Sequence, residues 1–298
     1  MDKALSYYLN PAQTERHAHH RVFEIDFLRG FDIFLMVLLH GCCAFADVGP
    51  GRLIAPISGQ DLPGVIAARD FAYFGVFSTI DYGNLWVLEF FFSSLFMFLC
   101  GISCSFSHNN YERGIKLSFV ALALTLILEF GDFAFHLNIH IYLGILHALA
   151  IGILFYALID HYFPSFWVDY AIGIGLAIAN IVTVYFAYSG TGGLYSPISM
   201  PEANLPREWY KLLLGTARFG DDYFSPINTS TFIFLGATVG KTYYKDKESH
   251  LPPYFPTKWA TPILWCGSNS LLLYVLHMPF FYLLLALILF PFGYRLAL

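Results

Sequence analysis

The sequence predicts an all-α protein, a polytopic bundle of about seven transmembrane helices. The first observation is composition: 57% of the 298 residues are hydrophobic and only 12% are charged, a balance well to the apolar side of an ordinary soluble domain. The second is the length of the apolar runs, because a membrane helix needs about 20 apolar residues. Runs of this kind occupy residues 27–46, 84–106, 115–135, 139–160, 166–188, 226–244 and 262–290.

The segments between these runs define the remaining organisation. Residues 1–25 are polar and lack the apolar core and cleavage site of a signal peptide, so we expect a cytoplasmic tail followed by a single transmembrane domain over 26–298. The partly apolar stretch 65–77 fits either a re-entrant piece or an additional span. The Gly- and Pro-rich segment 189–225 also carries aromatic residues suited to lipid headgroups, which predicts an ordered extracytoplasmic connection.

Charge and cysteine usage set the orientation and exclude some partners. With the amino terminus inside, inner segments carry nine Lys and Arg residues and outer segments six, Arg29 aside, which favours a cytoplasmic amino terminus. The net charge of −5 argues against nucleic acid as a partner. The cysteines all lie in apolar runs, where we expect neither disulfides nor a metal site. They are Cys42, Cys43, Cys100, Cys104 and Cys266.

The first hydrophobic run contains an unusually large number of polar side chains. Asp26, Arg29 and Asp32 stand near its start, and His40 interrupts its second half. Each costs roughly a few kcal/mol in or beside hydrocarbon, so a membrane helix keeps them only with partners or a function. On an α-helix His40 lies about 20° from the face of Arg29 and about 16 Å further along the axis. We expect Asp26 to pair with Arg29 or Arg21, and Arg29 and His40 to border one polar passage.

Ionisable residues on five predicted helices fall at a similar depth. Counting residues from each helix start places them in one layer, at a rise of about 1.5 Å per residue. Any one histidine could equally bridge two helices by a hydrogen bond, but a shared depth favours a functional site. The members of this layer are His40, Glu89, Glu129, His147 and His277.

This pattern suits acyl transfer. A neutral histidine can act as a general base, and a carboxylate such as Glu129 or Glu89 can fix its tautomer. Arg29 can bind phosphate in a bidentate fork, and the roughly 16 Å to His40 suits a thioester on a long pantetheine arm. Ser268 and Asn269, near the start of the last run, either bind ribose or adenine of the donor or cap a helix.

Several segments resemble the catalytic domain of heparan-alpha-glucosaminide N-acetyltransferase and its small bacterial relatives. They are R-x-x-x-I-D-x-L-R-G at 21–30 followed by Met36 and His40, and residues 96–107, 141–154, 232–241 and 267–279. The resemblance implies a multispan enzyme of the bacterial inner membrane. Such an enzyme would move an acetyl or acyl group from cytoplasmic acetyl-CoA, or another acyl-CoA, to an amino sugar or other glycan on the far side. The partners would be membrane lipids, acyl-CoA and that acceptor, with a homodimer left open.

The sequence departs from the family pattern at one important position. The family carries an asparagine where His40 stands and a histidine in the following loop, but residues 41–64 contain no histidine. The Arg29–His40 spacing is instead similar to bacterial membrane O-acyltransferases, which implies phosphate binding by Arg29 and base catalysis by His40. His147 and His277 match family segments without an assigned role.

Two other functions remain compatible with the same sequence. A proton-coupled transporter also places ionisable groups at one membrane depth, and in a non-catalytic scaffold these groups would only join helices. The sequence leaves open the acceptor, the acyl chain length and the oligomeric state. It also leaves open the choice between an acyl-enzyme and a direct ternary complex.

Overall fold

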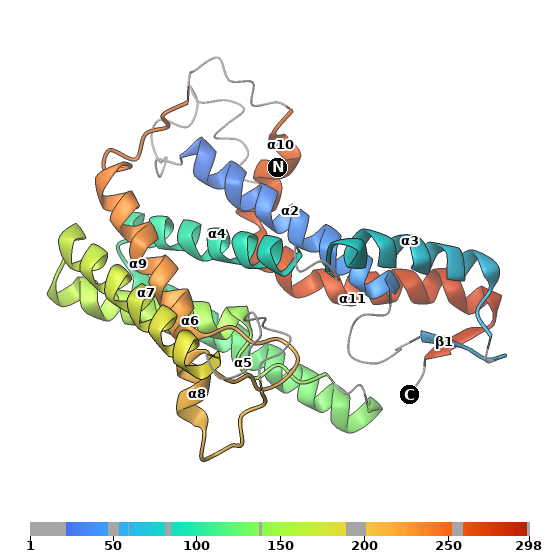
Figure 1. The fold of residues 1–298 in the computed structure, drawn as a ribbon. Coiled ribbons are helices and arrows are strands. Elements are labelled where there is room, and N and C mark those ends of the chain that lie inside the picture. The colour runs from blue at the N-terminus through green and yellow to red at the C-terminus, as the bar shows by residue number, and fades with distance from the viewer. Residues whose placement is uncertain are drawn as a thin grey trace. The chain divides into compact units, whose positions relative to one another are not determined.

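The computed structural model is mostly helical (Figure 1). The residues it describes are 22–46, 54–58, 60–80, 85–136, 139–188, 201–251 and 259–296. The chain divides into two compact units. Unit 1 comprises Met1–Phe92 and Tyr244–Leu298, and unit 2 comprises Ser93–Tyr243.

Unit 1 joins the two ends of the chain. Its described elements are α2 (Phe23–Ala46), β1 (Ile54–Pro56), α3 (Pro63–Ile80), the start of α4 (Leu85–Phe106), α10 (Thr261–Ser268), α11 (Ser270–Leu289), the 3-10 turn η3 (Phe290–Phe292) and β2 (Tyr294–Leu296). Unit 2 holds the middle of the chain. Its described elements are the rest of α4, α5 (Asn110–Phe135), α6 (Ile145–Tyr162), α7 (Phe166–Tyr188), α8 (Trp209–Leu214) and α9 (Pro226–Thr242).

Every predicted hydrophobic run contains a helix, but the count of about seven spans is not confirmed. Within the described residues, four helices are long and apolar enough to cross a membrane. The described apolar part of α4, Phe90–Phe106, is shorter than a span, and α9 has 17 residues. The remaining helix, α2, carries four charged residues in its first ten positions. The four helices are Asn110–Ala134, Ile145–Tyr162, Phe166–Tyr185 and Ser270–Phe292.

Local structure differs from the predicted boundaries in two places. The run predicted to begin at residue 139 starts as extended chain, and α6 begins only at Ile145. The extended piece is held by bridges from Ile141 to Gly220 and from Leu143 to Tyr223. The stretch 65–77 lies within α3, and the described part of the predicted connection, 201–225, contains the short helix α8.

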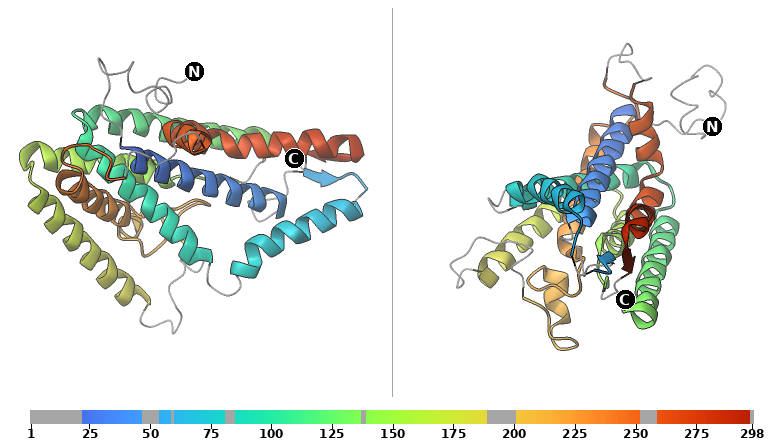
Figure 2. Two further views of the ribbon diagram at one scale, coloured as in Figure 1. Left: turned by 90° about the horizontal axis from the view of Figure 1, so that it is seen from above. Right: turned by 90° about the vertical axis from the view of Figure 1, so that its right-hand side faces the viewer.

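In unit 1, α2 packs along α10 and α11 in the same direction (Figure 2). Glycines make this packing close: a Cβ atom added to Gly30 would lie 1.8 Å from the carbonyl oxygen of Ile263, and one added to Gly267 would lie 2.2 Å from that of Asp26. Further along, the ring of Phe281 covers Gly41. The same direction is what the seven-span prediction requires of its first and last helices.

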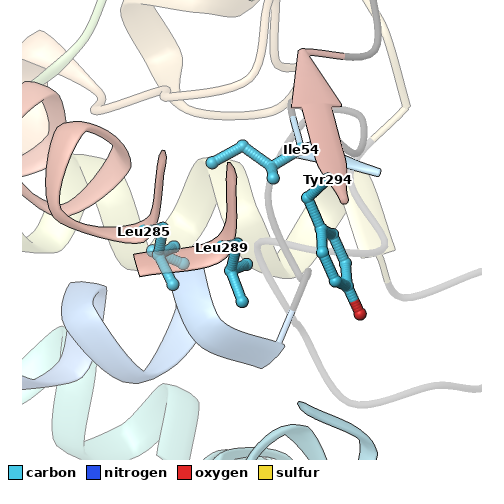
Figure 3. Packing of buried hydrophobic residues seen from close by; sticks show 5 residues of the cluster. Ile54, Leu285, Leu289 and Tyr294 are labelled. Atoms are coloured by element: carbon cyan, nitrogen blue, oxygen red, sulfur yellow. The ribbon is translucent and has the colours of Figure 1, made fainter. Parts of the chain in front are cut away.

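The C-terminal ends of α2 and α11 pack against a small two-stranded sheet. β1 pairs antiparallel with β2, with Ala55 opposite Arg295. Beneath the sheet lies a buried cluster of Ala44, Ile54, Leu285, Leu289 and Tyr294, four of which are labelled in Figure 3. The Tyr294 hydroxyl accepts a hydrogen bond from the Leu62 amide and donates one to Asp61, each at 3.0 Å. β2 therefore links the end of α11 to the segment that follows α2 by strand pairing and by the hydrogen bonds of Tyr294.

Candidate active site

The side chains of His40 and His277 meet between α2 and α11 in unit 1. Nδ1 of His40 lies 2.8 Å from Nε2 of His277, and the ring planes differ by only 15°. His277 is buried, whereas His40 is half-buried. The two residues are thus at one level along their helices, as their positions in the sequence predict.

Backbone carbonyls determine which ring nitrogens carry hydrogen. Nδ1 of His277 lies 2.6 Å from the carbonyl oxygen of Tyr274 and 3.2 Å from that of Leu273. A carbonyl oxygen only accepts, so Nδ1 of His277 must be the protonated nitrogen, and Nε2 of the neutral ring is an acceptor. His40 therefore donates from its own Nδ1. Nε2 of His40 keeps its lone pair, which is the form that a general base needs.

Small residues allow this pair to form. A Cβ atom at Gly41 would lie 2.7 Å from the ring of Phe281, one turn after His277 on α11. Since a larger side chain at 41 would push the two helices apart, the glycine beside His40 is what permits a direct contact between the two imidazoles.

Arg29 and the Ser268–Asn269 turn lie near the other end of this packing. Nη1 of Arg29 is 3.5 Å from Oδ1 of Asp26, which confirms the predicted pair. Ser268 Oγ and Asn269 Nδ2 each donate to the carbonyl of Trp265 at 3.0 Å. These bonds satisfy a carbonyl at the C-terminal end of α10. The predicted alternative, a side-chain cap at a helix start, is not seen, because Asn269 makes no side-chain cap hydrogen bond at the start of α11.

The other two predicted residues lie in unit 2, each with a partner there. Oε1 of Glu129 is 3.1 Å from Nδ1 of His140, and Nε2 of His147 is 3.1 Å from Oγ1 of Thr125. The predicted residues are thus brought together in two sets, one in each unit. Within unit 1, His277 contacts His40, and the side chain of Glu89 lies outside the described residues.

Sequence reasoning missed three contributors to these contacts. Tyr274 contributes its backbone carbonyl. Every residue has one, so the residue type gives no sign of this contact. Thr125 and His140 have side chains that can bond to a histidine and a carboxylate, and His140 stands next to a predicted helix start. A search for polar side chains next to the predicted helix start at residue 139 would have found His140, whereas Thr125 stands in the middle of the run 115–135.

The His140–Glu129 pair predicts a pH-dependent stability. The hydrogen bond that His140 donates to Glu129 raises the pKa of His140 above its ordinary value of 6.5, and the nearby charges of Asp132 and Asp221 act in the same direction. A raised pKa in the folded state stabilises the protein below the unfolded pKa, and this contribution is lost as pH rises through the folded value. We therefore expect Glu129→Gln to lower the thermal midpoint at about pH 5.5 and to have little effect at about pH 9. An equal effect at both pH values would contradict this assignment.

Comparison with known proteins gives one match. The family described as heparan-alpha-glucosaminide N-acetyltransferase, catalytic, matches residues 66–279, more than half of the chain and parts of both units. The matched range includes His277, Glu129 and His147 but not Arg29 or His40. No curated protein and no solved structure matches the chain.

Proposed function

The chain belongs to the heparan-alpha-glucosaminide N-acetyltransferase catalytic family, and from that premise we propose that it transfers an acetyl or other acyl group from acyl-CoA to an amino sugar or other glycan. Membership makes the chain a membrane acetyltransferase; the donor, the acceptor and the residue roles are our proposal. The observation that carries the roles is the hydrogen-bonded series from the Tyr274 carbonyl through His277 to His40. It leaves one basic nitrogen in a half-buried position on α2.

In the proposed reaction, Nε2 of His40 removes a proton from the acceptor amine or hydroxyl. The acceptor atom attacks the thioester carbonyl carbon, so that an amide or ester bond forms and the carbon–sulfur bond breaks. The thiolate of coenzyme A leaves and takes the proton from His40. His277 accepts the hydrogen bond from Nδ1 of His40 throughout and stabilises the ring as it becomes charged. Direct attack by His40 on the thioester would use the same lone pair, through an acyl-imidazole.

The donor would be held further along α2. We assign its phosphates to Arg29, whose guanidinium suits bidentate binding and lies about 16 Å along the helix from His40, a span suited to the pantetheine arm. We assign ribose or adenine contacts to Ser268 and Asn269. The close contact of Gly267 with the Asp26 carbonyl supports this, because it brings the turn to the Arg29 end of α2. The excess of Lys and Arg in inner segments supports a cytoplasmic donor, with the protein in a bacterial inner membrane.

The function is tested with the purified full-length chain in lipid nanodiscs, radiolabelled acetyl-CoA and a panel of amino sugars and lipid-linked glycans. We expect label on at least one acceptor. In the same assay His277→Phe should lower kcat by about ten- to a hundredfold with the KM for acetyl-CoA little changed, because the variant keeps a ring but loses the acceptor for His40. His277→Gln restores an acceptor atom and should recover part of the rate.

Two results would contradict different parts of the proposal. If the protein in liposomes takes up a solute in a proton-dependent manner and no acetyl group reaches any acceptor, the chain is a carrier rather than a transferase. If transfer occurs but His277→Phe and His277→Gln behave alike, the orienting role of His277 is wrong while the acetyltransferase function stands.

A further inference from the structure

Phe281 lies one turn beyond the histidine pair on α11. It follows His277 by four residues, about 6 Å along the helix, and its ring reaches across to α2. The three atoms closest to a Cβ atom added at Gly41 are Cζ, Cε1 and Cε2 of Phe281, at 2.7, 3.1 and 3.2 Å. These atoms form the outer end of the ring, so the ring points end-on at the backbone of α2, directly after His40.

Behind this ring, apolar side chains fill the contact between α2 and α11. Phe281 is half-buried and packs against the buried cluster that lies beneath β1 and β2 (Figure 3). The cluster includes Ala44, one turn after His40, and Leu285, one turn after Phe281. A close-packed apolar region does not accept additional methylene groups without strain. Phe281 therefore marks the boundary between the histidine pair and this packed region.

The proposed donor approaches the boundary from the opposite direction. Its phosphates are assigned to Arg29 and its thioester to His40, and Gly41 follows His40 in the direction that leads away from Arg29. In an acyl-CoA, the acyl carbons lie on the other side of the thioester from the pantetheine arm. A longer acyl chain would therefore continue along α2 towards Gly41, where the ring of Phe281 already occupies the space.

We propose that Phe281 is a specificity-determining residue that limits the acyl group to acetyl, because its ring occupies the space that acyl carbons beyond the acetyl methyl would need. A methylene group that does not fit its pocket changes the preference for a substrate by about tenfold or more. The inference rests on the proposed function for the identity and direction of the donor. The position of the ring rests on contacts within unit 1 alone.

The first test measures binding and needs no acyl transfer. Isothermal titration calorimetry on the full-length protein in nanodiscs uses S-ethyl-CoA and S-butyl-CoA, two thioethers that carry no transferable group. The wild type should bind S-ethyl-CoA about tenfold more tightly than S-butyl-CoA, because the longer chain meets the ring. Phe281→Ala removes the ring and should reduce this preference to about twofold or less.

The second test compares transfer of acetyl and butyryl groups from their CoA thioesters. The ratio of kcat/KM for butyryl-CoA to that for acetyl-CoA should rise about tenfold in Phe281→Ala, and a ratio does not depend on the amount of folded protein. Phe281→Leu keeps an intermediate volume and should give intermediate ratios, and it tests the idea should Phe281→Ala not fold. The matched control is Phe292→Ala, which removes a ring that is 64% exposed in η3 and should leave both preferences unchanged.

The outcomes separate this inference from the proposed function. The role of Phe281 is overturned if both thioether and acyl preferences stay at the wild-type value in Phe281→Ala and Phe281→Leu. It is equally overturned if the wild type binds the two thioethers with the same affinity, or binds neither. If the thioether preference changes with residue 281 but no acyl group reaches any acceptor, only the proposed reaction is wrong.

Discussion

Replacing His40 with alanine is expected to lower the rate of acetyl transfer by about a thousandfold, the size of effect that loss of a general base produces. The reason is specific to the α2–α11 pair. His277 donates its only ring hydrogen to the Tyr274 carbonyl, and its free nitrogen, Nε2, lies 2.8 Å from Nδ1 of His40. Because His277 is buried on α11, this nitrogen does not occupy the position from which Nε2 of His40 would meet the acceptor. The measurement is kcat with radiolabelled acetyl-CoA and the best acceptor found.

The control for His40→Ala is His108→Ala, which changes an exposed histidine in the connection before α5 and should leave kcat unaltered. Binding of acetyl-CoA should survive in His40→Ala, because we assign the donor phosphates to Arg29. Circular dichroism and a single elution peak establish that the variant is folded. If His40→Ala transfers acetyl groups at the wild-type rate, His40 has no part in the chemistry.

Hydropathy located the helices but not all their ends, and the reasons are physical. The last apolar run continues through residues 267–269, yet α10 ends at Ser268 and α11 begins at Ser270, where the backbone of Gly267 lies close to the Asp26 carbonyl. No property of the run itself reveals that contact. At the start of α6, Ile141 and Leu143 are apolar enough to extend the predicted helix. They adopt extended structure because they pair with the distant Gly220 and Tyr223.

The depth of residues along their helices predicted one contact of the candidate site. Counting residues along two parallel helices placed His40 and His277 at one level, and a 2.8 Å contact confirms it. The same counting predicts Glu129 at that level, which stays a prediction. Within unit 2, its carboxylate bonds to His140, a partner that helix rise alone does not predict. The sequence alone could not predict the tautomers of His277 and His147, because they depend on the backbone carbonyls of Tyr274 and Ile141, which accept from His277 and from the Thr125 hydroxyl.

The largest expected loss of stability comes from Gly30→Ala. The new Cβ would lie 1.8 Å from the carbonyl oxygen of Ile263 and 2.8 Å from the amide nitrogen of Gly267. Both are backbone atoms and cannot rotate aside as a flexible side chain would, so α2 and α10 must separate. We expect a loss of about 3 kcal/mol in the free energy of unfolding, the upper part of the range for overpacking. The thermal midpoint of the purified protein in a single detergent reports it.

The matched control for Gly30→Ala is Gly175→Ala, which we expect to change the thermal midpoint in the opposite direction. Gly175 stands inside α7, and nothing lies within 4 Å of the Cβ that alanine would add. Since alanine is the better helix former, Gly175→Ala should leave the midpoint unchanged or raise it, by the equivalent of about 0.5–1 kcal/mol. The two variants add the same methyl group to a helix and differ only in what it meets. If both variants lower the midpoint equally, the loss does not depend on what the new methyl group meets, and the close approach of α2 to α10 is not what makes Gly30→Ala destabilising.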